Sequence, residues 1–183
     1  MKTALDKELQ TETHIILNRE KVVRFFTLIC GMTEQLSETH SHILLVEDDM
    51  LFAPNLRMSL QVLISYRLPF IQLSIPSSLT LATSRKINPL VYHTKSNKLS
   101  YSGAYLISKE LLETFCGKVM LNPIEYLHAK FDLEMSREAS HVSQGIHLSP
   151  GLFGTDPSLV STLGHSMVAE DPHFDVNGAV KLC

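Results

Sequence analysis

The sequence has no excess of positive charge, and it has no tryptophan. Its 16 Lys and Arg residues against 19 Asp and Glu residues give a formal net charge of -3. A general nucleic-acid binder needs a basic stripe that faces the phosphate backbone, and no such stripe can be seen along this chain. We therefore expect no nucleic-acid partner. With 183 residues, 44% of them hydrophobic, the chain can form one domain with a buried core.

Cysteine is scarce as well. The three cysteines, Cys30, Cys116 and Cys183, are far apart and form no Cys-x-x-Cys pair. Cys30 and Cys116 lie among apolar residues, a pattern that predicts small buried side chains with free thiols. An odd number of cysteines without disulfide-like spacing indicates a reducing compartment rather than a disulfide framework.

Long hydrophobic runs are missing too. The longest runs, such as VVRFFTLICGM at residues 22–32, are too short to cross a bilayer. Residues 1–14 are polar and charged, unlike the apolar core of a signal peptide. These features predict a cytoplasmic protein and leave peripheral contact with a membrane surface open.

Segments of strand character alternate with segments of helical character along the chain. Strands are expected over residues 14–18, 42–47, 69–75, 89–94 and 102–108. Helices are expected over residues 19–36, from about 53 to 65, over 109–119 and within 122–135. The Gly, Pro and Ser content of residues 143–158 predicts a loop. This order predicts an α/β layered sheet in a single domain over residues 1–183, with residues 165–183 as a flexible tail.

Three adjacent carboxylates, Glu47, Asp48 and Asp49, follow the apolar run at residues 43–46. A short apolar run is typical of a strand buried in a sheet. Three acids at its end repel one another unless something positive neutralises them. The plainer interpretation is that these acids cap a strand and remain hydrated.

A receiver domain of two-component signalling also begins with an apolar strand that ends in paired acids. Its phosphoryl chemistry needs another Asp at the end of a later strand, but the sequence has no Asp between Asp49 and Asp132. A receiver also begins close to its acidic strand, whereas 46 residues precede Glu47 here. The receiver interpretation is therefore rejected.

The stretch LLVEDDMLFAPNLRMSL (44–60) resembles the DxD-type motif of GT-A-fold glycosyltransferases of the lipooligosaccharide-type family. Further similar segments follow in the family's order: YSGAYLISKELLETF (101–115), NPIEYLHAKF (122–131) and SPGLFGTDPSLVST (149–162). The likeness covers about residues 40–165. It implies an α/β fold with a GT-A-like (Rossmann-like) mixed sheet flanked by helices. Because the chain before Glu47 is short, the nucleotide-binding half is expected to be abbreviated.

The resemblance also implies a divalent cation, Mn²⁺ or Mg²⁺, that neutralises the leaving nucleoside diphosphate. Asp49 would bind the metal. Glu47 and Asp48 would be substrate-binding residues, with Glu47 near the ribose or a metal-bound water and Asp48 on the opposite face of the strand. His165 in TLGHS is the best-placed further metal ligand, and His147 is the second choice.

Three more residues receive roles from the resemblance. Gly103 and Ala104 would let the backbone approach the donor sugar, although a Gly in a strand also marks simple bulges. Glu125 would be the catalytic base that takes the proton of the acceptor hydroxyl in an inverting transfer, although an acid in a first helical turn is also an ordinary capping residue.

The predicted function is therefore transfer of a sugar from a nucleotide-sugar donor to a glycan acceptor. The alternative is a catalytically inactive GT-A-like domain that binds carbohydrate or a partner protein. The acids and histidine of the tail, at residues 170–175, are interpreted as solvated surface rather than as a metal site.

Overall fold

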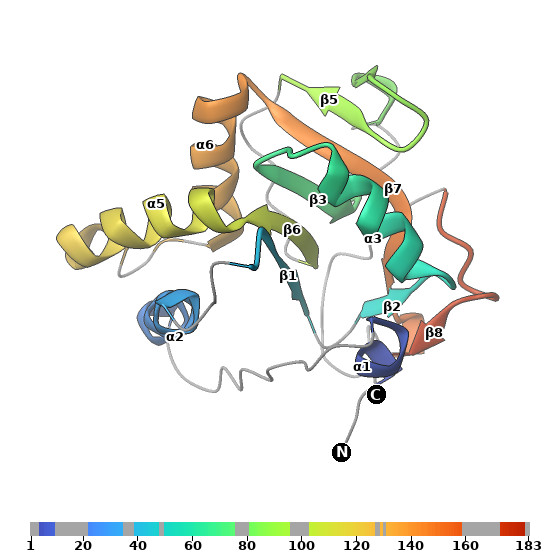
Figure 1. Ribbon diagram of the computed structural model, residues 1–183, viewed down its shortest axis with the longest axis horizontal. Helices are drawn as coiled ribbons and strands as arrows, with labels where there is room; N and C mark the ends of the chain where they lie inside the picture. The colour runs from blue at the N-terminus through green and yellow to red at the C-terminus, as the bar shows by residue number, and fades with distance from the viewer. Residues whose placement is uncertain are drawn as a thin grey trace.

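The computed structural model describes residues 4–9, 22–34, 39–47, 50–75, 81–95, 103–126, 129, 131–158 and 173–181. The helices are α1 (Ala4–Leu9), α2 (Val22–Glu34), α3 (Leu56–Ser65), α5 (Lys109–Leu121), the 3-10 helix η1 (Pro123–Tyr126) and α6 (Phe131–Ser143). The strands are β1 (His42–Val46), β2 (Met50–Phe52), β3 (Phe70–Ser74), β4 (Arg85–Lys86), β5 (Tyr92–Thr94), β6 (Ala104–Ser108), β7 (Ile146–Thr155) and β8 (Val180–Lys181) (Figure 1).

The strands form one mixed sheet. Its main path has the order β1-β6-β3-β7-β2-β8. Strand β6 is antiparallel to both β1 and β3, whereas β3 and β7 run parallel. Strand β5 pairs with the first part of β7, and β4 pairs with β5. The prediction of a mixed sheet flanked by helices is confirmed.

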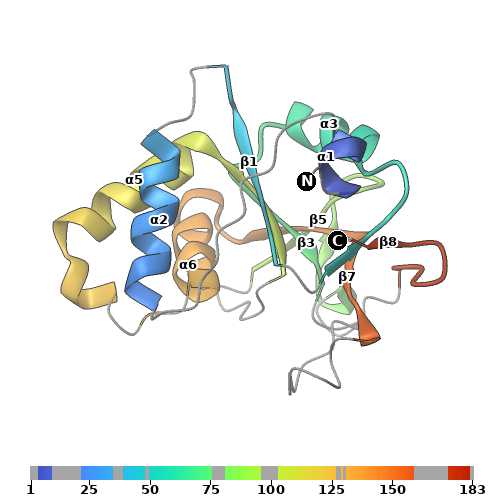
Figure 2. The same ribbon diagram turned by 90° about the horizontal axis from the view of Figure 1, so that it is seen from below.

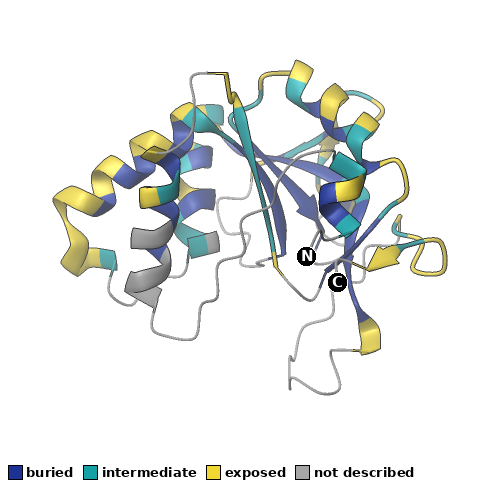
Figure 3. Ribbon diagram, turned by 60° about the horizontal axis from the view of Figure 1, so that its bottom comes forward, coloured by how far each residue is buried: buried dark blue, intermediate teal, exposed yellow. Residues whose placement is uncertain are grey.

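Helices cover both faces of this sheet. Side chains alternate between the faces along each strand, so Tyr105 and Ile107 of β6 pack with α2, α5 and α6. Ala104 and Leu106 point the other way and pack with α1 and α3. Figures 1 and 2 show α2, α5 and α6 gathered on one side of the sheet, with α1 and α3 on the other. Strands β3 and β6 lie between two apolar layers and are buried (Figure 3).

A disulfide bond joins α2 to α5 through Cys30 and Cys116, whose Cα atoms are 5.3 Å apart. Both residues are buried, as predicted. The prediction of free thiols is wrong, because the two cysteines form a disulfide. The sequence did not reveal this bond, since only the packing of α2 against α5 brings together two cysteines 86 positions apart. Disulfides persist in oxidising surroundings, so the cysteines no longer indicate a reducing compartment.

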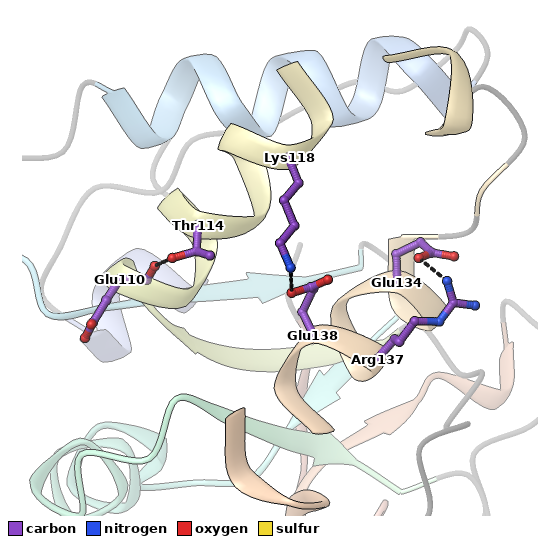
Figure 4. Close-up of polar contacts among 6 residues, drawn as sticks. All are labelled: Glu110, Thr114, Lys118, Glu134, Arg137 and Glu138. Atoms are coloured by element: carbon purple, nitrogen blue, oxygen red, sulfur yellow. Dashed lines mark hydrogen bonds and ion pairs between the residues drawn. The ribbon is translucent and has the colours of Figure 1, made fainter. Parts of the chain in front are cut away.

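Helices α5 and α6 are joined by a charged contact on the outer side of the same layer. Lys118 Nζ of α5 lies 2.5 Å from Glu138 Oε2 of α6. Figure 4 shows this contact beside the Arg137–Glu134 ion pair within α6. No helix in the described part of the chain is long and apolar enough to cross a membrane.

Strand β7 is the main correction to the expected elements, because residues 143–158 were predicted to be a loop. It instead passes through the sheet between β3 and β2, with every residue buried except Pro150 and Gly151, which are partly exposed. These two residues lie where the pairing with β3 shifts register. Proline cannot donate a hydrogen bond to a sheet, and an irregularity is where a strand tolerates it.

The last described segment belongs to the same sheet. Val180 of β8 pairs with Phe52 of β2, and the Phe174 ring packs against Gly154, where a Cβ atom would overlap it. Residues 173–181 of the predicted tail therefore contact the domain. The strand expected at 14–18 lies outside the described residues.

Candidate functional site

Three of the predicted substrate-binding residues are Glu47, Gly103 and Ala104, and the structure brings them together. Strands β1 and β6 pair from His42 opposite Ser108 to Val46 opposite Ala104. The ladder extends one step further, because the Glu47 amide donates a 2.7 Å hydrogen bond to the Gly103 carbonyl. Glu47 is exposed, whereas Gly103 is buried. An acidic strand end therefore lies against a residue without a side chain.

The neighbouring strand β3 fixes this edge through a residue that sequence reasoning missed. The Ala104 amide donates a 3.0 Å hydrogen bond to Ser74 Oγ, and both residues are fully buried. The paired residues of β3 and β6 end at Gln72 and Tyr105, so the Ser74 hydroxyl supplies an acceptor where the ladder stops. The only available signal was a hydroxyl residue at the end of the apolar segment FIQLS. Ala104 is thus a core residue that supports Gly103.

The acids lie where the sheet curls. Strands β1 and β2 are four places apart in the sheet order, which would separate them by ~19 Å in a flat sheet. The four Cα–Cα steps from Val46 to Met50 span at most ~15 Å. The sheet must therefore curl, and the Met50 amide donates a 3.4 Å hydrogen bond to the Glu47 carbonyl at this point. Asp48 and Asp49 lie outside the described residues.

Another acid, Asp156, borders the same place. It follows Thr155, the partner of Met50 at the end of β7. Its buried carboxylate accepts hydrogen bonds from the Ser158 amide and hydroxyl, at 2.9 and 2.6 Å, and lies 2.9 Å from Lys181 Nζ. Hydrogen bonds from Ser158 and Lys181 lower the pKa of Asp156 to about 2. Asp156 is therefore ionised at neutral pH and already neutralised by its own partner.

The residue types at this strand end suit a hard divalent cation. Mg²⁺ and Mn²⁺ prefer carboxylate oxygens, and Glu47 offers one that is exposed. The described residues contain no group of three or more His, Cys, Asp or Glu side chains that could hold a metal. A cation here would thus need a further ligand, for which Asp49 is the residue predicted from the sequence.

Glu125, the predicted base, lies on η1 and is exposed. Its amide donates a 3.1 Å hydrogen bond to the Asn122 carbonyl. The next residue, Tyr126, packs against Phe26 and Phe115 in the helical layer. Glu47 lies at the end of the β1–β6 ladder opposite to the start of α5. Glu125 thus lies beside the helical layer that contains α5, whereas Glu47 lies at the far end of the β1–β6 ladder from α5.

Of the two predicted histidine ligands, His147 lies in the described part of the chain and is remote from the acidic strand end. His165 lies outside the described residues. His147 lies eight positions before Thr155 on β7, which is ~25 Å along a strand. Its ring centroid is 5.1 Å from that of His93. Burial and the neighbouring His93 lower the pKa of His147 from 6.5 to about 4, so His147 is neutral at pH 7.

No family model, no curated protein and no solved structure matches this chain. The case for a function therefore rests on the residues themselves and on their arrangement.

Proposed function

We propose that this protein is a metal-dependent glycosyltransferase with a GT-A-like fold. It transfers a sugar from a nucleotide-sugar donor to a glycan acceptor, with inversion at the sugar carbon. The observation that carries the proposal is the 2.7 Å hydrogen bond between the Glu47 amide and the Gly103 carbonyl. It joins two of the segments that resemble the family, the acidic strand end and the segment that begins YSGAYLIS.

The chemistry of these residues supports a donor site. The leaving nucleoside diphosphate develops negative charge, and Mn²⁺ or Mg²⁺ bound by carboxylates would neutralise it. Asp49 would bind that ion, with Glu47 near the ribose or a metal-bound water and Asp48 as a further substrate-binding residue. Gly103 is buried, so it would support the donor site by letting Glu47 pack against its backbone. Ser74 and Ala104 would keep this backbone in place.

The position of β1 supports an abbreviated nucleotide-binding half. β1 is at the end of the main strand path, and its five residues are only partly buried. In the part of the chain that the structure describes, helices α1 and α2 precede β1 and no strand does. A larger sheet would continue beyond this edge.

The position of Glu125 favours the second candidate, a GT-A-like domain that binds a donor or glycan without turnover. A general base must come within hydrogen-bonding reach of the acceptor hydroxyl, and Glu125 lies on η1 in the helical layer. Glu125 remains the proposed base in the enzyme. Release of nucleoside diphosphate from a nucleotide-sugar donor, measured with the wild type and with Glu125→Gln, separates the two candidates. The enzyme should release it in the wild type and more slowly in Glu125→Gln, whereas the binding domain should release none.

Thermal melting with Mn²⁺ and a panel of nucleoside diphosphates tests the donor site. A ligand at ~100 times its dissociation constant adds about 2.7 kcal/mol, which raises Tm by roughly 5 to 10 °C for a domain of this size. We expect the rise only when metal and one nucleotide are present together. It should disappear in Glu47→Gln and in Asp49→Asn.

Glu110→Gln is the matched control for the loss of one exposed carboxylate, because Glu110 lies in the first turn of α5 (Figure 4). This variant should keep the full shift. If no nucleotide shifts the Tm of the wild type, the protein has no donor site, and the proposed transferase function is contradicted.

A further inference from the structure

One arginine and two histidines form a row across β4, β5 and β7. Arg85 is the register partner of His93 in the β4–β5 pair, and His93 is the register partner of His147 in the β5–β7 pair. Register partners lie directly opposite each other with their side chains on the same face of a sheet. The centroids of the two imidazole rings are 5.1 Å apart.

These three residues line an open groove of about 660 Å³, together with Lys95, Ile87 and Ser143. This volume is within the range of small-molecule sites. Among the described residues that line the groove, none is Asp or Glu. Arg85 and Lys95 are both exposed, so the groove has two permanent positive charges at its surface and two imidazoles beside them.

The groove has positive charge at Arg85 and Lys95 and no carboxylate among its described lining residues. At the inner end, His147 is 7% exposed, and its Nδ1 atom is buried without a hydrogen-bond partner in the described structure. A buried polar atom without a partner is costly. A bound anion would offset the positive charges of Arg85 and Lys95, and a hydroxyl group on the same ligand would satisfy His147 Nδ1.

Gly145 allows His93 to occupy this place. A Cβ atom on Gly145 would lie 2.5 Å from His93 Nε2 and would also overlap the Thr94 carbonyl. The residue has a φ of +149°, which side chains rarely adopt. Strand β5 can therefore approach the beginning of β7 closely enough to place the two imidazoles side by side.

We propose that this groove binds the phosphate group of a small phosphomonoester. Arg85 and Lys95 provide the charges, and the unpartnered His147 Nδ1 accepts a hydrogen bond from a hydroxyl group in the rest of the ligand. A phosphomonoester carries nearly two negative charges at pH 7, which match the two permanent cations. Arginine has the planar fork that binds phosphate oxygens in pairs. The rest of the ligand would lie along Ile87, because the groove is larger than a phosphate ion.

This site is separate from the proposed donor site. It adjoins the first residues of β7, whereas the acidic strand end adjoins its last residues. It requires no divalent cation and does not depend on the glycosyltransferase proposal. A buffer with EDTA therefore isolates it, because the donor site is expected to be silent without Mn²⁺.

Isothermal titration in EDTA at fixed ionic strength is the test, with inorganic phosphate, a hexose monophosphate and a nucleoside monophosphate as probes. We expect one of the two organic phosphates to bind more tightly than inorganic phosphate. Arg85→Gln and Lys95→Gln should each weaken binding about tenfold or more, as for the loss of a charge-assisted hydrogen bond. Tighter binding of the hexose ester or of the nucleotide identifies the source of the phosphate group.

Lys86→Gln is the matched control, since it removes one positive charge from the same hairpin. Lys86 is the next residue along β4 and lies over the Tyr92 ring, 5.7 Å from its centroid, and it is not among the groove residues. This variant should bind the probes like the wild type. Near-UV circular dichroism checks that each variant is folded.

Several results would overturn the proposal. One is that none of the three probes binds, even at millimolar concentration. Another is that the wild type, Arg85→Gln and Lys95→Gln have equal affinities. A third, measured without EDTA, is a response to Zn²⁺ alone with none to the phosphates, which would make the His93–His147 pair a cation site instead.

Discussion

The Cys30–Cys116 disulfide joins the middle of α2 to the middle of α5 across 86 positions of the chain. A bond that closes so long a loop restricts the unfolded chain, and such bonds contribute about 3 to 5 kcal/mol. We expect the double variant Cys30→Ser with Cys116→Ser to lose this amount of unfolding free energy and therefore to unfold at a lower urea concentration. Urea unfolding under non-reducing conditions measures it.

Dithiothreitol supplies the internal check on this prediction. It should destabilise the wild type and leave the double Ser variant unchanged. Cys183→Ser, which keeps the Cys30–Cys116 bond, is the matched control and should respond to dithiothreitol like the wild type. Equal stability of the wild type with and without reductant would show that the bond contributes nothing.

The buried His147 should make stability depend on pH between about 6.5 and 4. Its folded pKa, about 4, is below its unfolded value of 6.5, so the unfolded chain binds the proton more readily within this interval. As far as His147 is concerned, the protein is therefore most stable above pH 6.5. It loses about 2 to 3 kcal/mol of unfolding free energy as the pH falls from 6.5 to 4. Chemical unfolding at several pH values, in chloride buffer without phosphate, measures it.

His147→Gln is the variant for this test, because glutamine does not titrate. Its unfolding free energy should change less between pH 6.5 and 4 than that of the wild type. The exposed His173 offers a matched control, since His173→Gln removes an exposed histidine. Parallel pH curves for His147→Gln and the wild type would contradict the assignment.

Asp156 should act at lower pH. Its folded pKa of about 2 is below the unfolded value of 3.8. Ionised Asp156 therefore adds its full stabilisation above pH 3.8, and this stabilisation is lost as the pH falls towards 2.

Asp156→Asn should destabilise the protein by roughly 1 to 3 kcal/mol at pH 7, because it weakens hydrogen bonds to a charged group. Lys181→Gln should cost less, since Lys181 is largely exposed. The reverse order would contradict this account of Asp156.

The sequence predicts those elements whose signals are local. Helix α5 begins at Lys109, as predicted, directly after Ser108, whose hydroxyl accepts a hydrogen bond from the Leu111 amide. The apolar run of β1 and the alternation of β3 likewise predicted strands close to the observed bounds. In each case, the residues that determine the element lie within a few positions of each other in the sequence.

The features that the sequence did not predict share one property: each depends on contacts between segments that are far apart in the chain. Strand β7 contains Pro150 and Gly151, which predict a loop, and its strand character comes from burial between β3 and β2. The disulfide depends on the packing of α2 against α5. The row of Arg85, His93 and His147 exists only because β5 lies beside β7, with β6, α5 and α6 between them in the chain. Local patterns contain no information about such pairing.

Ser74 offers the sharpest test of how the candidate site is supported. Ser74→Ala leaves the buried Ala104 amide without its acceptor, which should cost about 1 to 3 kcal/mol of unfolding free energy. Ser65→Ala is the matched control, because the Ser65 hydroxyl makes an exposed hydrogen bond to the Val62 carbonyl, and it should cost less than ~0.5 kcal/mol. Because Ala104 is the first residue of β6 and follows Gly103, the Gly103, Ala104 and Glu47 amides should exchange hydrogen faster in Ser74→Ala than the change in global stability predicts. A uniform change across the sheet would mean that Ser74 stabilises the core without positioning the edge at which Glu47 meets Gly103.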